Sequence, residues 1–241
     1  MNRVLPAAST AALAALLLSC TANAAGIRIT GPSLFMELDG GWMPGALDDG
    51  VQIFSSQDLA FMQNELQADG INTQGHITMF LAETGDGWSF VSLFDGNGGG
   101  TPSGNNSFLN FSSTTSSEAN RHWNADAGGT PQWWDLGNET QLVDGAFEWE
   151  SGVNSEGFAW SNMDPGMSGT ATYVNMGLDQ LIPQGMFQFL TWGGDQWNVA
   201  YTADFQDAED SLALAFKVIP TPATIALLAM AGVVRRRRRR R

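Results

Sequence analysis

Ile-Thr-Met-Phe-Leu-Ala-Glu-Thr-Gly-Asp-Gly-Trp-Ser-Phe-Val-Ser-Leu-Phe, residues 77–94, is the stretch that decides the fold. Residues 77–83 and 88–94 are two apolar runs rich in aromatic and branched side chains, which is typical of strands. The residues between them include Asp86-Gly87, and Asp-Gly suits the positive backbone angles of a tight turn. The stretch therefore predicts a β-hairpin.

The rest of the body repeats this pattern of short strands and turns. A second hairpin is expected between 186–192 and 197–203, and apolar side chains alternate at Leu212, Leu214 and Phe216. Many short strands separated by turns predict an all-β fold, either a sandwich or a jelly roll. Further strands are expected at 27–30, 33–38, 107–112, 157–161 and 170–176.

One short helix interrupts the strands. Ser56 is placed to cap it, Leu59, Met62 and Leu66 fall on one face, and Gly70 can end it. The chain has no internal repeat and no biased stretch long enough to mark a second domain. We therefore expect one β-sandwich domain over residues 25–217.

The charges of this body are strongly unequal. All 25 acidic residues lie between Glu37 and Asp210, and the body has only three basic residues, Arg28, Arg121 and Lys217, so its net charge is −22. This excludes a nucleic-acid binder, because such proteins need Lys and Arg to neutralise phosphates. The same charge repels acidic polysaccharides unless divalent cations bridge them.

Residues 1–24 are predicted to be a signal peptide. Arg3 supplies a positive start, residues 11–18 are apolar, and Ala22-Asn23-Ala24 has the small-x-small pattern of a cleavage site. The only cysteine, Cys20, would leave with this segment, so the mature chain would have no disulfide and no thiolate ligand. The alternative is that Cys20 is a lipoprotein cysteine.

The C-terminal residues 218–241 contain three features in order: Pro220-Thr221-Pro222-Ala223, an apolar run, and seven arginines from Arg235. Thr221 and Pro222 suit the start of a helix. A helix over 222–234 would be about 20 Å long, which is short against a hydrocarbon core of about 30 Å. The arginines should stay in the cytoplasm, which places the body outside.

This order of features resembles the PEP-CTERM sorting signal of Gram-negative envelope proteins, which has a Pro-Glu-Pro-like motif, a short transmembrane helix and a terminal arginine cluster. Thr221 stands where the family has Glu. The resemblance implies transient membrane insertion and processing by an exosortase, a membrane cysteine protease-transpeptidase. Release to the cell surface or matrix, often beside exopolysaccharide production, would follow. A plain C-terminal membrane anchor is the alternative.

Four tryptophans lie beside polar side chains and are candidate glycan-binding residues: Trp123, Trp133, Trp134 and Trp197. An indole can stack on the apolar face of a sugar while neighbouring amides and carboxylates bond its hydroxyls. The alternative is that these rings fill the core. Adjacent Trp133 and Trp134 cannot both face inward in a regular strand, because successive side chains point to opposite faces.

A calcium site is a second candidate, because Asp95, Asn97 and the glycines after them resemble half of a calcium loop. The pattern has no closing Glu, and the alternative is that these residues form a turn. No other cofactor is expected.

The acids and histidines include few candidate catalytic residues. Glu148 and Glu150 are expected on one strand face, about 7 Å apart, opposite Phe147 and Trp149. Two facing carboxylates suit a glycoside hydrolase, but an acidic body is also expected to have such pairs on a solvated face. His122 lies in a polar cluster, and no Gly-x-Ser-x-Gly motif is present. We expect no catalytic residues.

The sequence therefore predicts an exported, acidic, non-enzymatic protein of the cell envelope or matrix. Its expected partners are signal peptidase and an exosortase-type enzyme during export, then exopolysaccharide. The body would be a structural or interaction module. A lectin-like glycan-binding protein and a secreted polysaccharide-active glycoside hydrolase are the two alternatives.

Overall fold

The computed structural model describes residues 25–47, 54–96, 106–125, 130–177, 186–205 and 210–220. The chain forms one compact unit, Gly26–Ile219, and a second unit made of Met1–Ala25 and Pro220–Arg241. The predicted signal peptide and the motif residues Thr221, Pro222 and Ala223 lie outside the described residues. Among the helices that the structure describes, none is long and apolar enough to cross a membrane.

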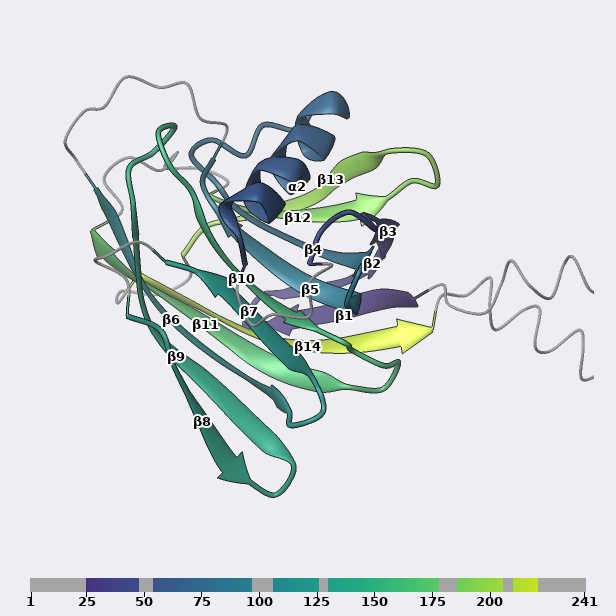
Figure 1. Cartoon of the computed structure of the whole chain (residues 1–241), viewed down its shortest axis with the longest axis vertical. Helices are drawn as coiled ribbons and strands as arrows, with labels where there is room; N and C mark the ends of the chain where they lie inside the picture. Colours follow the sequence, from purple (N-terminus) through teal and green to yellow (C-terminus); the bar gives the residue numbers. More distant parts are fainter. Residues whose placement is uncertain are drawn as a thin grey trace, which may run out of the picture. The chain divides into compact units, whose positions relative to one another are not determined.

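In its described residues, the unit Gly26–Ile219 contains two β-sheets and one helix, which are drawn in Figure 1. Sheet A has the strand order β2-β1-β14-β11-β6-β9-β8, and sheet B has the order β13-β12-β4-β5-β10-β7, with β3 paired to β4. The elements are β1 (Ala25–Gly31), β2 (Leu34–Asp39), β3 (Gly41–Trp42), α2 (Ser56–Ala68), β4 (Ile77–Thr84), β5 (Gly87–Phe94), β6 (Ser107–Ser116), β7 (Asn120–Asn124), β8 (Gln132–Gly137), β9 (Thr140–Trp149), β10 (Glu156–Ser161), β11 (Ser168–Gly177), β12 (Phe187–Trp192), β13 (Trp197–Ala203) and β14 (Ser211–Pro220).

This architecture confirms the predicted all-β class with one helix. Strands β4 and β5 form the antiparallel hairpin predicted over residues 77–94, with Thr84 opposite Gly87 at the turn. Strands β12 and β13 form the second predicted hairpin. The five further strands expected from the sequence are also present. Strands β3, β7 and β8 were not predicted.

Aromatic rings fill the space between the two sheets. Three pairs join a strand of sheet A to a strand of sheet B, with ring centroids 4.6–4.8 Å apart: Phe216 with Phe90, Phe147 with Phe94, and Phe111 with Phe158. Polar contacts also cross the interface. The Trp160 Nε1 donates to the Ser113 hydroxyl at 2.8 Å, and the hydroxyls of Ser92 and Tyr173 lie 2.9 Å apart. The side chains on the inner faces of both sheets are therefore buried in the core.

A second core lies on the outer face of sheet B, under helix α2 (Figure 1). Leu59, Met62 and Leu66 of the helix are buried there, as predicted. The predicted cap was wrong by one residue. Ser55 is the N-cap, because its side chain accepts from the Asp58 amide while the Asp58 carboxylate accepts from the Ser55 amide.

The last strand extends beyond the predicted domain boundary at residue 217. Val218 is buried and continues the inward-facing series of Leu212, Leu214 and Phe216. Strand β14 ends at Pro220, which is the first residue of the predicted sorting motif. The apolar side chains that sequence analysis assigned to the sorting signal therefore belong partly to the sandwich.

We predict that Phe94→Ala will lower the free energy of unfolding by about 3–5 kcal/mol, because it leaves a cavity among several rings. Phe94 contacts Phe111, Phe147, Trp149 and Tyr173. The matched control is Phe35→Ala, since Phe35 is 68% exposed. Urea unfolding of both variants checks this, and an equal effect of the two substitutions would contradict the described core.

Candidate functional site

Strand β8 carries two of the predicted glycan-binding residues on opposite faces. Trp133 pairs with buried Val143 and so faces inward, whereas Trp134 pairs with Leu142 and faces outward. Both indoles are 40% exposed, because β8 is the edge strand of sheet A and the β8–β9 hairpin projects from the body (Figure 1). The structure thus agrees with the expectation that these two rings cannot share a face.

The two indoles differ in how much of each ring is available. The Arg121 guanidinium of β7 lies 3.9 Å from the centroid of the Trp133 ring, and the Trp133 Nε1 donates to Gln141 at 2.9 Å. A cation over an indole is attracted by the π-system and covers one face. Trp134 has no such partner within the described ranges. Trp134 is therefore the better platform for an apolar sugar face.

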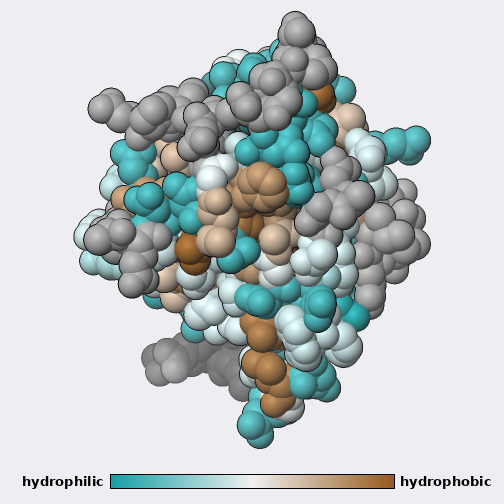
Figure 2. All heavy atoms as spheres, turned by 90° about the vertical axis from the view of Figure 1, so that its left-hand side faces the viewer, coloured by the Kyte–Doolittle hydropathy of each residue, from teal (hydrophilic) through white to brown (hydrophobic). Residues whose placement is uncertain are grey.

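Figure 2 shows hydrophobic side chains gathered along the lower part of the molecule, where the β8–β9 hairpin lies. Leu136, near the tip of this hairpin, is exposed, and Leu142 is partly buried beside Trp134. Contiguous apolar side chains on a protein surface can mark a binding surface.

The other two tryptophans are less accessible. Trp123 is half-buried on β7, opposite Phe158. Trp197 is only 2% exposed, and its ring packs against Phe80 and Trp192 at centroid distances of 5.2 and 5.4 Å. The prediction that Trp197 binds glycan is therefore corrected: its polar neighbours point away, and the indole itself fills the core beneath α2.

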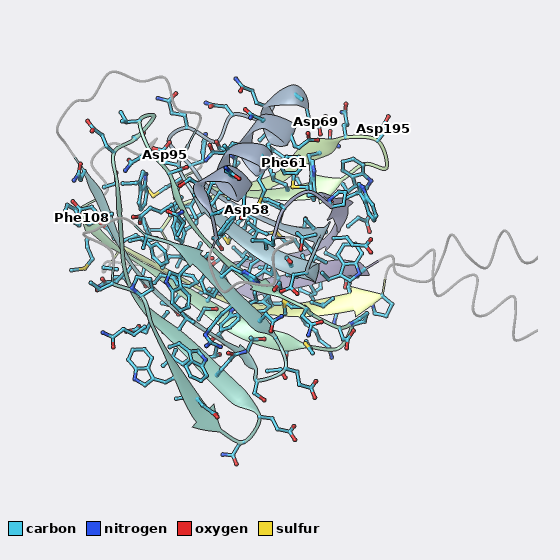
Figure 3. All side chains as sticks on the ribbon, viewed as in Figure 1. Asp58, Phe61, Asp69, Asp95, Phe108 and Asp195 are labelled. Carbon is cyan, nitrogen blue, oxygen red and sulfur yellow. The ribbon has the colours of Figure 1, made fainter. Side chains whose placement is uncertain are left out.

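Asp95 lies where three loops meet, at the upper left of Figure 3. It is fully buried with a positive φ of 52°, and its Oδ1 accepts from the backbone amides of Gly75, Gly96 and Gly152. Its Oδ2 has no hydrogen-bond partner among the described residues. Asp95 thus joins the loops that precede β4, follow β5 and follow β9.

The predicted calcium site is not tested by this geometry, because Asn97 lies outside the described residues. Within the ranges that the structure describes, no group of three or more His, Cys, Asp or Glu side chains could hold a metal ion. The Asp95 oxygen that has hydrogen-bond partners, Oδ1, accepts from backbone amides.

The two acids considered for catalysis lie at the end of β9. Glu148 is partly buried on the strand, and its Oε1 accepts from the Asn106 amide. Glu150 follows the strand, and its backbone amide donates to Asn154 at 2.6 Å. Phe147 and Trp149 are buried, as expected from their alternation with the acids.

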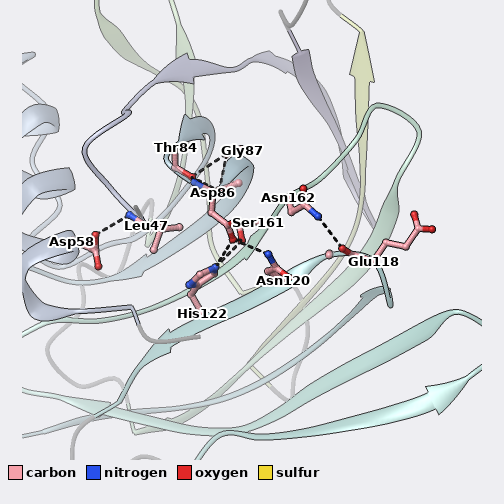
Figure 4. Close-up of polar contacts among 12 residues, drawn as sticks. Leu47, Asp58, Thr84, Asp86, Gly87, Glu118, Asn120, His122, Ser161 and Asn162 are labelled. Carbon is pink, nitrogen blue, oxygen red and sulfur yellow. Dashed lines mark hydrogen bonds and ion pairs between the residues drawn. The ribbon is translucent and has the colours of Figure 1, made fainter. Parts of the chain in front are cut away.

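The polar residues around His122 in the sequence join side chains from two distant segments to form one polar cluster, as Figure 4 shows. The Asp86 Oδ2 accepts from Asn120 at 3.0 Å and also contacts the His122 Nε2 at 3.0 Å and the Ser161 hydroxyl. The His122 Nε2 also lies 2.7 Å from the Ser161 Oγ. These residues come from the β4–β5 turn, β7 and β10.

This cluster contains Ser, His and Asp but does not have the arrangement of a catalytic triad. In a triad, one imidazole nitrogen faces the serine and the other faces the aspartate. Here the His122 Nε2 faces both, and Nδ1 is buried with no partner among the described residues. Ser161 is fully buried and donates to Asp86. The cluster therefore connects the β4–β5 turn to strands β7 and β10.

No protein-family model matches the chain, and no curated protein matches it.

We predict that the Asp86 contacts stabilise the fold above the ordinary Asp pKa, near 4, and that this stability is lost in acid. Burial acts to raise the pKa of Asp86, but hydrogen bonds from Ser161, Asn120 and His122, with the charge of His122, outweigh burial and lower it. Because the folded pKa is depressed, the contribution is complete above the unfolded pKa and disappears as pH falls through the folded pKa.

The measurement is the urea midpoint of wild type and Asp86→Asn between pH 2 and 7, a range that spans the ordinary Asp pKa of about 4. The difference between the two proteins should shrink as pH falls. Asp144→Asn, at an exposed position, is the control and should track wild type. A difference that does not change with pH would contradict this role of Asp86.

Proposed function

We propose that this chain is an exported protein of the cell envelope or matrix whose β-sandwich binds exopolysaccharide without catalysis. The proposal for export rests on the predicted signal peptide, residues 1–24, which signal peptidase would remove. The proposal for sorting rests on the PEP-CTERM-like segment, which an exosortase-type enzyme would process after transient membrane insertion. Because β14 ends at Pro220, this segment would follow the sandwich directly.

Between the two predicted all-β folds, we propose a sandwich that is not a regular jelly roll. Strand β12 pairs with β4 in parallel, with Phe187 opposite Ile77. Jelly rolls are built from antiparallel strands. The outer face of sheet A is a large surface that no helix covers in the described part of the chain.

The single observation that carries the glycan-binding proposal is the exposed indole of Trp134 on the outer face of edge strand β8. An aromatic ring fixed in a strand loses little conformational freedom when it stacks on a sugar. Asp144 and Gln132 lie one register step away on the same face and can bond to hydroxyls. These features also support a non-enzymatic role, because stacking and hydrogen bonding require no acid–base pair.

We predict that Trp134→Ala will weaken binding of the folded body, residues 25–220, to its best ligand on a glycan array by about tenfold, since this equals about 1.4 kcal/mol of lost stacking. Trp133→Ala should have a smaller effect because Arg121 covers one face of that ring. Trp42→Ala is the matched control, since Trp42 is 58% exposed on β3. Binding that Trp134→Ala leaves unchanged, or no binding by wild type, would remove this proposal.

For sorting, we predict that the intact mass of the protein isolated from its native envelope corresponds to a chain without residues 1–24 and without Arg235–Arg241. Signal peptidase and the exosortase-type enzyme would make the two cuts. A chain found with its arginines attached would support the plain membrane anchor instead.

A further inference from the structure

The outer face of sheet A contains one row of side chains that crosses all seven strands. Antiparallel registers place Phe35 opposite Thr30, Ala215 opposite Thr170, Thr170 opposite Thr114, Thr114 opposite Leu142, and Leu142 opposite Trp134. The Thr30 Oγ1 completes the row by its 3.4 Å hydrogen bond to the Ala215 carbonyl of β14. With strands about 4.8 Å apart, the row is about 29 Å long.

The chemistry of this row changes along its length. Both ends are exposed aromatic rings, Phe35 at 68% and Trp134 at 40%. Three of the five residues between them are threonines, alongside Ala215 and Leu142, and the Oγ1 atoms of Thr170 and Thr114 lie 2.8 Å apart. An extended chain of sugars could lie across these strands, with rings stacked at the ends and hydroxyls bonded in the middle.

A groove of about 330 Å³ opens on this face between β1, β14 and β11. Ala215 is small and leaves a depression, which the longer side chains of the neighbouring strands surround. The polar and charged residues that line it are Arg28, Thr30, Ser168, Thr170 and Lys217. Registers place Lys217 opposite Ser168, and Arg28 opposite Glu37 on β2, in the row beside the one described above.

The groove concentrates positive charge in an acidic body. Arg28 and Lys217 are two of the three cationic side chains between residues 25 and 220. Arg28 donates to the Glu37 Oε1 at 2.6 and 2.8 Å, whereas Lys217 has no acidic partner within the described ranges. The net charge of the body repels an acidic polymer at low salt. At physiological salt the Debye length is about 8 Å, so this repulsion from distant acids is screened and an anion in the groove would interact mainly with Arg28 and Lys217.

We propose that the outer face of sheet A binds a polysaccharide of uronic acids, which lies across the strands between Phe35 and Trp134 and places a carboxylate in the groove beside Lys217 and Arg28. The inference rests on the proposed glycan-binding function and specifies its ligand class. A carboxylate matches the ammonium of Lys217, and the hydroxyls of Thr30, Ser168 and Thr170 match a sugar more closely than an acidic peptide, which carries few hydroxyls.

The test measures binding of the body, residues 25–220, to polygalacturonate in EDTA, so that no divalent cation bridges protein and polymer. The same polymer with its carboxylates reduced to alcohols is the neutral comparison, and poly-L-glutamate is the polyanion without sugar. We expect polygalacturonate to bind at least about tenfold tighter than either, because each comparison lacks one of the two recognised features.

Three variants test the groove. Lys217→Gln should weaken polygalacturonate binding about tenfold, because it removes the cation that lacks an acidic partner. Glu37→Gln should strengthen it, because it releases Arg28 from its carboxylate. Glu65→Gln makes the same substitution and the same change in net charge on helix α2, over sheet B, and should leave binding unchanged. All three positions are exposed, so urea midpoints should stay at the wild-type value.

The outcomes separate this inference from the glycan-binding function. Equal binding of the neutral polymer, with no effect of Lys217→Gln, would overturn the carboxylate site and leave glycan binding intact. Equal strengthening by Glu37→Gln and Glu65→Gln would assign the effect to net charge and overturn the groove. If poly-L-glutamate bound as tightly as polygalacturonate, the claim that this face recognises a sugar would be overturned. No binding of either polysaccharide would overturn this inference, whereas the glycan-binding function would fall only if wild type also bound nothing on the glycan array.

Discussion

The contact of aromatic rings between sheets A and B is the interaction on which the rest of the structure depends. Pairs such as Phe94 with Phe147 and Phe111 with Phe158 join strands that are far apart in the sequence. Each buried ring removes a large apolar area from water, and burial at about 25 cal/mol per Å² makes this the dominant favourable term. The body needs no disulfide to hold the two sheets together.

Because strand side chains alternate, filling the inner faces determines what the outer faces can do. The outer face of sheet B receives α2 and a second apolar core, which includes Trp197. The outer face of sheet A instead presents many threonines, serines and alanines, with exposed rings at Phe35, Phe108 and Trp134. Its small side chains produce the groove at Ala215, and its registers bring Arg28 and Lys217 to the walls of that groove.

The sequence predicted those parts of the fold that depend on local pattern. The hairpin over residues 77–94 has clear apolar runs and an Asp-Gly turn, and the inward series Leu212, Leu214 and Phe216 alternates regularly. Strand β8 lacks this pattern, since Gln132–Gly137 is exposed on both faces. Ser55 and Ser56 both suit the N-cap of the helix, and only the contacts with Asp58 distinguish them.

The sites were harder to predict because they depend on contacts between distant segments. Trp134 and Trp197 have similar polar neighbours, but only the tertiary packing exposes one ring and buries the other. The Asp86, His122 and Ser161 cluster comes from three separate segments. The groove requires β1 to lie beside β14, although the bonded residues Thr30 and Ala215 are 185 positions apart. No local motif encodes such a register.

Hydroxyl-radical footprinting of the protein, read by mass spectrometry, tests most directly whether sheet A has one packed face and one open face. We predict fast oxidation of Phe35 and Trp134, which lie at the two ends of the outer row, and slow oxidation of Trp149 and Trp160, which are buried between the sheets. Trp149 or Trp160 oxidised as fast as Trp134 would contradict the sandwich and, with it, the assignment of the binding face.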